Sequence, residues 1–226
     1  MAEYTVEATY GAMAGAAMFQ AEDRGIQEGT TRPEVDVRRA PWWWVRGLQR
    51  TGRLPLLLGI LGLDAFALLT RAQHPEADVP FWVFLLLPLT VAAVVVAVRG
   101  SWFACRLART ARRKTGAHVR YVLLHSHTSA APWLVFFPGH GEEEAEPLGA
   151  LKLSYGPVRH YYRDLPAAVG TAELSGEVRD GSVVVPWIGD RPVWPTDFFR
   201  ELVPEDHGQI EFLSELTAHK PFRGQA

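Results

Sequence analysis

The sequence predicts an α+β membrane protein, in which an antiparallel transmembrane helix hairpin is followed by a small antiparallel β barrel or sheet domain. Three observations predict this class: two long apolar runs, clusters of basic residues outside these runs, and short β-rich runs further along the chain. The 226-residue chain has a net charge of −2 and is 48% hydrophobic. These averages describe no single part of the molecule, because apolar, basic and acidic residues occupy separate segments.

The two apolar runs have the length and composition of membrane spans. Residues 54–71 are predicted as the first span and residues 80–98 as the second, whose 19 residues include no charge. At about 1.5 Å per residue, such runs reach about 25–28 Å, close to the ~30 Å hydrocarbon core of a bilayer. The short connection between them requires the chain to turn straight back. A buried helix pair in a soluble protein is the alternative.

The distribution of basic residues predicts the orientation of the hairpin. Residues 38–53, before the first span, contain five arginines. Residues 71–79, at the connection between the spans, contain one basic residue, and residues 99–114, after the second span, contain six. The positive-inside rule therefore predicts a multi-pass protein of the cell membrane with both the N-terminus and the C-terminus in the cytoplasm. Tryptophans near the span ends are expected to form a membrane-interface belt, with a partner-binding motif at residues 41–44 as the alternative. The belt residues are Trp42, Trp43, Trp44, Trp82 and Trp102.

The acid inside the first span needs a compensating contact. An ionised carboxylate at the centre of a membrane helix costs about 2.5–3.5 kcal/mol on insertion scales. We expect Asp64 to form an intramembrane interface, either with Thr90 of the second span or with its own copy in a homo-oligomer. The alternative is that neighbouring leucines carry the insertion and Asp64 is merely tolerated.

The segments outside the spans divide into five further regions. Residues 1–37 are acidic and predicted to be disordered, although residues 8–20 could form a helix, and residues 38–53 form a basic and aromatic juxtamembrane segment. Residues 99–115 are expected to form a basic juxtamembrane helix, residues 117–200 a cytoplasmic β domain, and residues 201–226 a tail with a short helix. The lipid bilayer is the expected partner of the basic helix, through anionic headgroups. The contacting residues are Arg99, Arg106, Arg109, Arg112 and Arg113.

The β domain is read from short runs of β-forming residues. Strands are expected at residues 118–125, 132–138, 150–155, 171–178, 182–188 and 191–194. Asp180-Gly181 predicts a type I′ hairpin turn and Gly189-Asp190 predicts another reversal. The expected core contains Trp133, Phe137, Leu153, Leu174, Val184, Trp187 and Trp194. If Trp187 and Trp194 were exposed instead, they would be candidate contacts for a protein partner.

Motifs for catalysis or for a cofactor are not found, so the sequence predicts no catalytic residues, no cofactor and no enzyme. The single cysteine, Cys105, excludes an intrachain disulfide framework and a cysteine-rich zinc site. His125, His127 and His140 are weak candidates for a metal site, with Glu142 or His160 as further ligands. Because the basic segments flank apolar spans, membrane contact is favoured over nucleic-acid binding.

The strings SVVVPWIGDRPVWP, RYVLLHS and PWLVFFPG resemble a group of uncharacterised actinobacterial, Streptomyces-type, two-span membrane proteins. The likeness covers residues 40–200 and implies a cell-membrane protein, but it transfers no activity and no functional residues. The plan of a membrane hairpin followed by a small β module is also similar to NfeD-type proteins, whose cytoplasmic OB-fold domains are associated with membrane proteases.

These expectations together favour an integral membrane anchor or adapter, whose cytoplasmic β module recruits an unknown protein partner or larger assembly. A metal-dependent or membrane-protease-associated protein is one alternative. An oligomeric membrane protein that uses Asp64 is the other.

Overall fold

The structure, a computed structural model, describes residues 8–23, 54–73, 81–113, 115–129, 131–141, 143–153, 166–189, 191–203 and 206–218. The chain divides into two compact units. The first, here called the β unit, comprises residues 1–39 and 110–226; the second, the helical unit, comprises residues 40–109. The β unit thus contains segments from both ends of the chain. The fold is α+β, as predicted.

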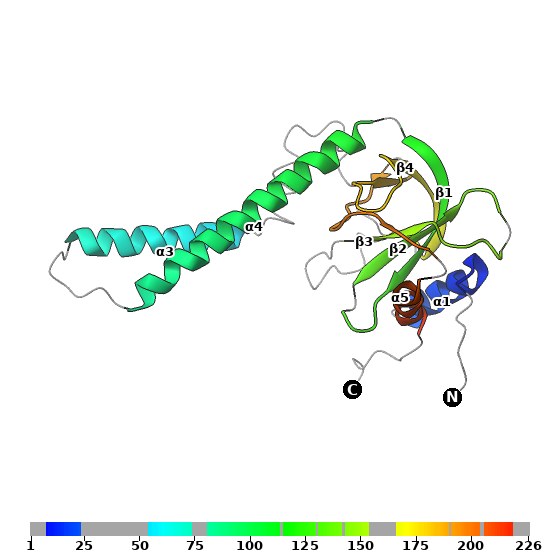
Figure 1. Cartoon of the computed structure of the whole chain (residues 1–226), viewed down its shortest axis with the longest axis horizontal. Coiled ribbons are helices and arrows are strands. Elements are labelled where there is room, and N and C mark those ends of the chain that lie inside the picture. Colours follow the sequence, from blue (N-terminus) through cyan, green and yellow to red (C-terminus); the bar gives the residue numbers. More distant parts are fainter. Residues whose placement is uncertain are drawn as a thin grey trace. The chain divides into compact units, whose positions relative to one another are not determined.

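Within the described residues, one antiparallel sheet of seven strands forms the centre of the β unit. The strand order is β6-β5-β4-β1-β2-β3-β7, with β1 at the centre. The strands are β1 (Thr115–His125), β2 (Pro132–Pro138), β3 (Gly149–Lys152), β4 (Val169–Ser175), β5 (Val185–Ile188), β6 (Arg191–Pro192) and β7 (Arg200–Glu201). The central strands β4, β1 and β2 are the longest, and Figure 1 shows β1 curving strongly through the unit.

The sheet buries side chains on both of its faces. Along β1, Val119, Tyr121 and Leu123 belong to one core cluster, and the alternate residues Val122 and Leu124 belong to a second. Strand β2 divides in the same way between the two clusters. Because successive side chains of a strand point to opposite faces, a strand buried on both faces must be apolar throughout. This explains the apolar runs at Tyr121–Leu124 of β1 and Trp133–Phe137 of β2.

The first core cluster is enclosed by the curvature of the sheet. After β6 the chain turns back along β3, where Leu153 forms an isolated bridge with Pro195 and the Thr196 amide donates to the Lys152 carbonyl at 2.8 Å. The Phe199 amide then donates to the Ser182 carbonyl at 2.8 Å. The segment between β6 and β7 therefore connects the two edges of the sheet, and the sheet approaches a closed barrel.

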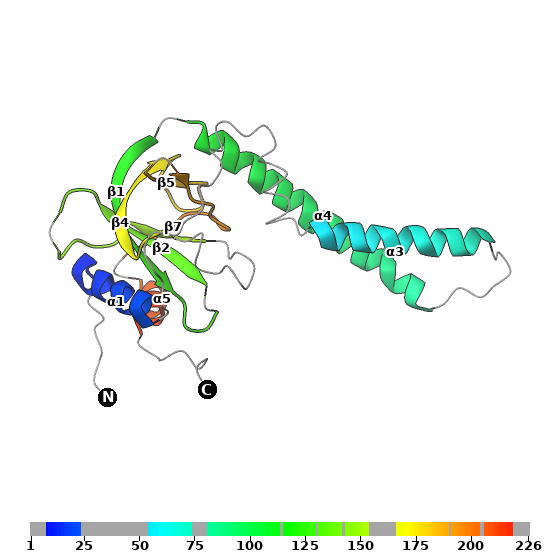
Figure 2. The ribbon, with the colours of Figure 1, turned by 180° about the vertical axis from the view of Figure 1, so that it is seen from behind.

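The second core cluster is covered by two helices from opposite ends of the chain, α1 (Tyr10–Asp23) and α5 (His207–Thr217). Figure 2 shows them side by side on one face of the sheet. Helix α5 confirms the predicted short C-terminal helix, and the Asp206 carboxylate caps it by accepting from the Gly208 amide at 2.9 Å. Helix α1 contradicts the prediction of disorder for the described part of residues 1–37 and agrees with the alternative of a helix at residues 8–20. Leu213 and Leu216 are buried, as is Met13 of α1.

The boundaries of the predicted β domain need two corrections. First, Asp180-Gly181 does not form a two-residue type I′ turn, because β4 ends at Ser175 and pairs there with Val185. The connection is a nine-residue loop in which Gly176 and Gly181 have positive φ angles of 114° and 71°. Second, the sheet includes residues 200–201 and α5 packs on it, so residues after 200 are not a separate tail. The reversal between Ile188 and Arg191 is as predicted.

The helical unit contains α3 (Leu54–Gln73) and most of α4 (Phe81–Ala111). Helix α4 continues without a break from the second apolar run into the basic segment, which confirms a helix there, and it contains Pro88. Its position beside a membrane stays a prediction. Within the residues that the structure describes, one stretch, Leu86–Ala111, is long and apolar enough to cross a membrane.

Candidate functional site

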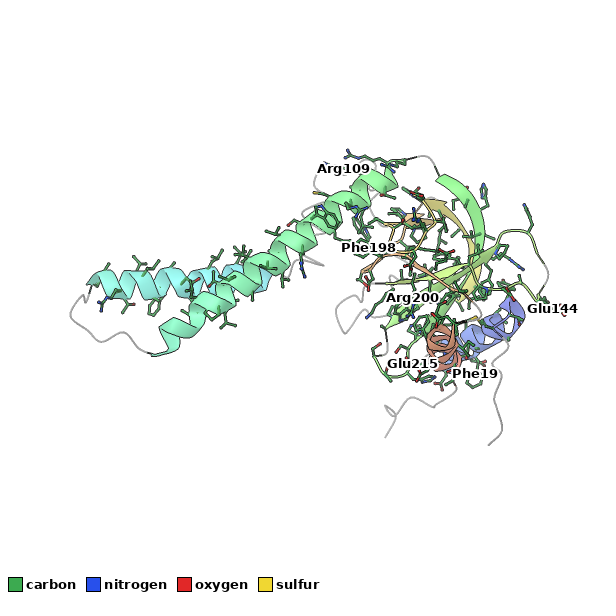
Figure 3. All side chains as sticks on the ribbon, viewed as in Figure 1. Phe19, Arg109, Glu144, Phe198, Arg200 and Glu215 are labelled. Carbon is green, nitrogen blue, oxygen red and sulfur yellow. The ribbon has the colours of Figure 1, made fainter. Side chains whose placement is uncertain are left out.

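The helical unit exposes many large apolar side chains. On α3, Leu58, Phe66 and Leu68 are 60–71% exposed, and on α4 Leu87 is 72% and Val98 61% exposed. Helices of soluble proteins bury one apolar stripe and expose polar residues elsewhere. A contiguous exposed apolar surface instead marks a contact with protein or lipid. Side chains project from both helices along their length (Figure 3), and many of the exposed ones are apolar.

Asp64 of α3 and Thr90 of α4 form a hydrogen bond between the two helices. The Thr90 hydroxyl donates to Asp64 Oδ2 at 2.5 Å, and both residues are half-buried. The same hydroxyl lies 2.9 Å from the Leu86 carbonyl of its own helix. Because a hydroxyl has one proton, it can serve one of these two acceptors fully at a time. The expected contact between Asp64 and Thr90 is present, while its intramembrane setting stays a prediction.

The last part of α4 separates charged from apolar side chains. Arg99, Trp102, Arg106 and Arg109, here called the arginine face, are all exposed. At about 100° per residue, these four positions fall within about a quarter of the helix circumference. Residues of the opposite side are buried: Gly100, Phe103, Ala104, Leu107, Ala108 and Ala111. The segment is therefore an amphipathic helix whose polar side carries cations.

The arginine face contains an ordered cation–aromatic pair. The guanidinium carbon of Arg106 lies 4.8 Å from the centre of the Trp102 ring, and Trp102 is 54% exposed. Residues 81–113 contain five arginines and no acid, so the sequence offers these cations no carboxylate on their own helix. Arg112 and Arg113 follow α4 and are exposed as well, and Arg109 is labelled near the end of the helix in Figure 3.

The predicted belt and contact tryptophans have different outcomes. Trp42, Trp43 and Trp44 lie outside the described residues, as does the side chain of Trp82. Trp102 is exposed on α4, and its place in a membrane-interface belt stays a prediction. Trp187 is only 5% exposed because β5 turns it into the β unit, so it is a core residue and not a surface contact. Trp194 is half-buried.

The histidines proposed as metal ligands do not converge. His125 is buried at the end of β1 opposite Pro132, whereas His140 follows β2 beyond the pair Val119 and Pro138. Six strand positions at about 3.3 Å separate these two ends by about 20 Å, far beyond ligation. His127 lies in a turn, so it does not share a strand face with His125. No metal-binding group of His, Cys, Asp or Glu occurs among the described residues. Glu142 and His160 lie outside them.

A cluster of hydroxyl groups around Glu215 was not predicted. Glu215 Oε1 accepts from the Ser126 hydroxyl at 2.6 Å and from the Thr128 hydroxyl and amide. The Ser126 and Thr128 hydrogen bonds hold the pKa of the Glu215 carboxyl below its ordinary value, because they favour the ionised form. Ser126 donates to a carboxylate and not to an imidazole, so the cluster is not a catalytic triad. It attaches α5 to the connection between β1 and β2.

Helix α1 is held on the sheet by specific contacts as well as by burial. The Gln20 amide bridges two elements: its Oε1 accepts from the His125 amide of β1 at 2.9 Å, and its Nε2 donates to the Leu216 carbonyl of α5 at 2.8 Å. Near the start of the helix, the Arg120 guanidinium lies 4.0 Å from the centre of the Tyr10 ring. Met13 is fully buried between these two attachments. Segments separated by more than a hundred residues are thus packed into one core.

No protein-family model, no curated protein and no solved structure matches the chain. The resemblance to actinobacterial two-span proteins and to the NfeD plan therefore stays a prediction.

Proposed function

We propose that this chain is an integral anchor or adapter of the cell membrane. Helices α3 and α4 cross the bilayer as an antiparallel pair, and both termini lie in the cytoplasm. The β unit, including α1 and α5, is held at the inner face of the membrane, where it recruits a protein partner or a larger assembly.

The observation that carries the proposal is the packing of α1 on the sheet. Helix α1 precedes both helices of the helical unit in the chain, and β1 follows them, yet Met13 is buried against the sheet and Gln20 bonds to His125. Two segments that share a core lie on the same side of any membrane. The chain between residues 23 and 115 must therefore cross a bilayer an even number of times. If α4 crosses, a second segment must cross too, and α3 is the apolar helix that precedes it.

The dimensions and exposures of the two helices support two crossings. Helix α3 has 20 residues, which give about 30 Å at 1.5 Å per residue. Residues 81–98 of α4 give about 27 Å before the first arginine, Arg99. In hydrocarbon the exposed leucines, valines and phenylalanine of these helices need no protein cover. The basic residues before and after the pair favour a cytoplasmic position for both ends.

The Asp64–Thr90 contact supports a pair within one chain. Inside a bilayer, a polar side chain is stabilised when a neighbouring helix supplies a hydrogen-bond partner. Thr90 supplies a donor to Asp64 at 2.5 Å within the same chain. A homo-oligomer joined through Asp64 is therefore not needed to satisfy this carboxyl group, and we place that alternative second.

The native cysteine allows a direct test of the orientation. Cys105 is exposed on α4, seven residues after Val98, and it is the single cysteine of the chain. In intact cells a membrane-impermeant maleimide should leave Cys105 unlabelled, and in inverted vesicles it should label Cys105. In the matched variant Cys105→Ser with Ala77→Cys, the pattern should be reversed, because Ala77 lies between the two helices.

Two results would overturn the proposal. One is release of the full chain from membranes by alkaline carbonate without detergent. The other is labelling of Cys105 and of Ala77→Cys from the same side of the membrane, which would mean that α4 does not cross. A short permeable bis-maleimide provides an independent check in the variant Cys105→Ser, Ala16→Cys, Thr217→Cys, since both introduced positions line one small cavity between α1 and α5. An intramolecular cross-link in intact cells requires that both ends of the chain lie on one side.

A further inference from the structure

The arginine face of α4 has a position and chemistry that suit a particular class of ligand. We propose that Arg99, Trp102, Arg106 and Arg109 bind the phosphate groups of anionic phospholipids in the cytoplasmic leaflet. This inference rests on the proposed function, because it requires that α4 leaves the bilayer near Arg99.

The direction of the helix places the guanidinium groups toward the lipid. In an α-helix each Cα–Cβ bond leans toward the N-terminus, and long side chains cover the preceding turn. The contact between Arg106 and Trp102, four residues earlier and 4.8 Å away, follows this rule. Because the apolar part of α4 is N-terminal to the arginine face, its arginines point back toward the headgroup layer. If a helix instead entered the membrane by its C-terminal end, arginines just outside the membrane would point away from the headgroup layer.

The depth of the four side chains matches the headgroup region. Arg99 follows the last valine of the apolar run, and Trp102 lies one turn further, where an amphipathic ring prefers the interface. Arg106 and Arg109 start about 12–16 Å along the axis from Val98, but their side chains extend back by one turn. A charged group in this position stays within a Debye length of about 8–10 Å of the lipid phosphates.

The charge of the surface favours an anionic ligand over a zwitterionic one. The arginine face contains three cations, and residues 81–113 contain no acid. Guanidinium groups bind phosphate oxygens in a bidentate geometry, and the exposed ring of Trp102 supports one of these groups. A cation near an anionic membrane surface gains about 1 kcal/mol, which is about fivefold in affinity for each arginine. Because the residues on the opposite side of α4 are apolar and buried, the three cations are gathered on one side of the helix.

Lipid counting on the intact protein tests the inference. The full chain in neutral-detergent micelles is titrated separately with phosphatidylglycerol and with phosphatidylcholine of the same acyl chains, and bound lipids are counted by native mass spectrometry. We expect tighter binding of phosphatidylglycerol, and a loss of about 25-fold in its affinity in Arg99→Gln with Arg106→Gln. Replacing the same two residues by lysine keeps the charge but removes the planar guanidinium groups, so the loss of affinity should be smaller than in the glutamine variant but measurable. Arg179→Gln, an exposed arginine of the β unit, is the matched control and should have no effect.

Several outcomes would overturn the inference. They are equal affinity of the wild-type protein for both lipids, unchanged phosphatidylglycerol binding in the glutamine variant, an equal loss in Arg179→Gln, and tighter binding of a DNA duplex than of phosphatidylglycerol. Membrane fractionation of the wild-type protein separates the two proposals. A chain that remains in carbonate-washed membranes but shows no lipid preference refutes only the arginine-face inference, whereas a chain released by carbonate refutes the proposed function.

Discussion

Replacement of Thr90 by valine tests the contact between α3 and α4. Valine has nearly the shape of threonine but cannot donate a hydrogen bond, so Thr90→Val removes the donor 2.5 Å from Asp64 Oδ2. The reverse change, Asp64→Leu, removes the acceptor. The two changes are not equivalent, because the Thr90 hydroxyl also has the Leu86 carbonyl within reach at 2.9 Å. After Asp64→Leu the hydroxyl bonds to its own helix, whereas after Thr90→Val the carboxyl group loses this donor.

The expected magnitudes follow from this asymmetry. Hydrogen bonds between membrane helices contribute about 0.6 kcal/mol on average and up to about 1.7 kcal/mol. The short distance and the acidic acceptor place this bond in the upper part of that range, so Thr90→Val should destabilise the helix pair by about 1 kcal/mol. Asp64→Leu should be neutral or stabilising, because it also removes an acid that costs about 2.5–3.5 kcal/mol at a helix centre. In the Asp64→Leu background, Thr90→Val should have almost no effect.

A double-mutant cycle in mixed micelles measures these terms. The full-length wild type, both single variants and the double variant are unfolded with SDS, and helix content is followed by circular dichroism. Thr90→Ser retains the hydroxyl and serves as the control, with stability close to that of the wild type. The reasoning fails if Thr90→Val has the same effect in both backgrounds, because the coupling energy between the two positions would then be zero.

Three further predictions concern the β unit. Met13→Ala should lower the free energy of unfolding by about 2–5 kcal/mol in thermal or chemical denaturation, because Met13 is fully buried, whereas Met18→Ala at a 54% exposed position should change it by less than about 0.5 kcal/mol. Gln20→Ala removes both bridging hydrogen bonds of α1, so the free energy of unfolding should fall by about 1–3 kcal/mol. Amide hydrogens of α1 should then exchange faster, and unchanged exchange would contradict the bridge. The pKa of Glu215 is lower in the folded than in the unfolded chain. The carboxylate therefore stabilises the fold fully above its ordinary pKa of 4.5, and this stabilisation is lost as the pH falls through the folded pKa. The free energy of unfolding of Glu215→Gln should consequently depend less on acid pH than that of the wild type.

Local sequence patterns predicted those elements whose own residues carry a clear pattern. Strand β2 was predicted with its observed bounds, Pro132–Pro138, because an apolar run between turn signals leaves little choice of boundary. The short helix at His207–Thr217 follows from the spacing of Leu213 and Leu216. The contact of Asp64 with Thr90 could be expected because an acid inside an apolar helix requires a polar neighbour.

The packing of α1 on the sheet was not predicted, although residues 8–20 were noted as a possible helix. The sequence of α1 is rich in alanine and glycine and has few large apolar residues, so its amphipathic pattern is weak. Its burial depends on β1 and α5, and Gln20 bonds to residues 105 and 196 positions away. The same limit explains the error at Asp180-Gly181. The Gly181 amide donates to the Phe199 carbonyl, a contact that no local turn rule contains.

In the proposed membrane topology, the distance along the chain between α1 and the strands that it covers links folding to orientation. A 14-residue helix of this composition is only marginally stable alone, so α1 gains its stability when β1 and α5 are in place. These elements follow both helices of the helical unit in the chain. If only one of the two helices inserted, α1 and the sheet would lie on opposite sides of the bilayer, and Val122, Leu124 and Phe137 would lose the cover that α1 provides. Under the proposed topology, completion of the β unit would select chains in which both helices have crossed, and the second core cluster would stabilise the orientation as well as the fold.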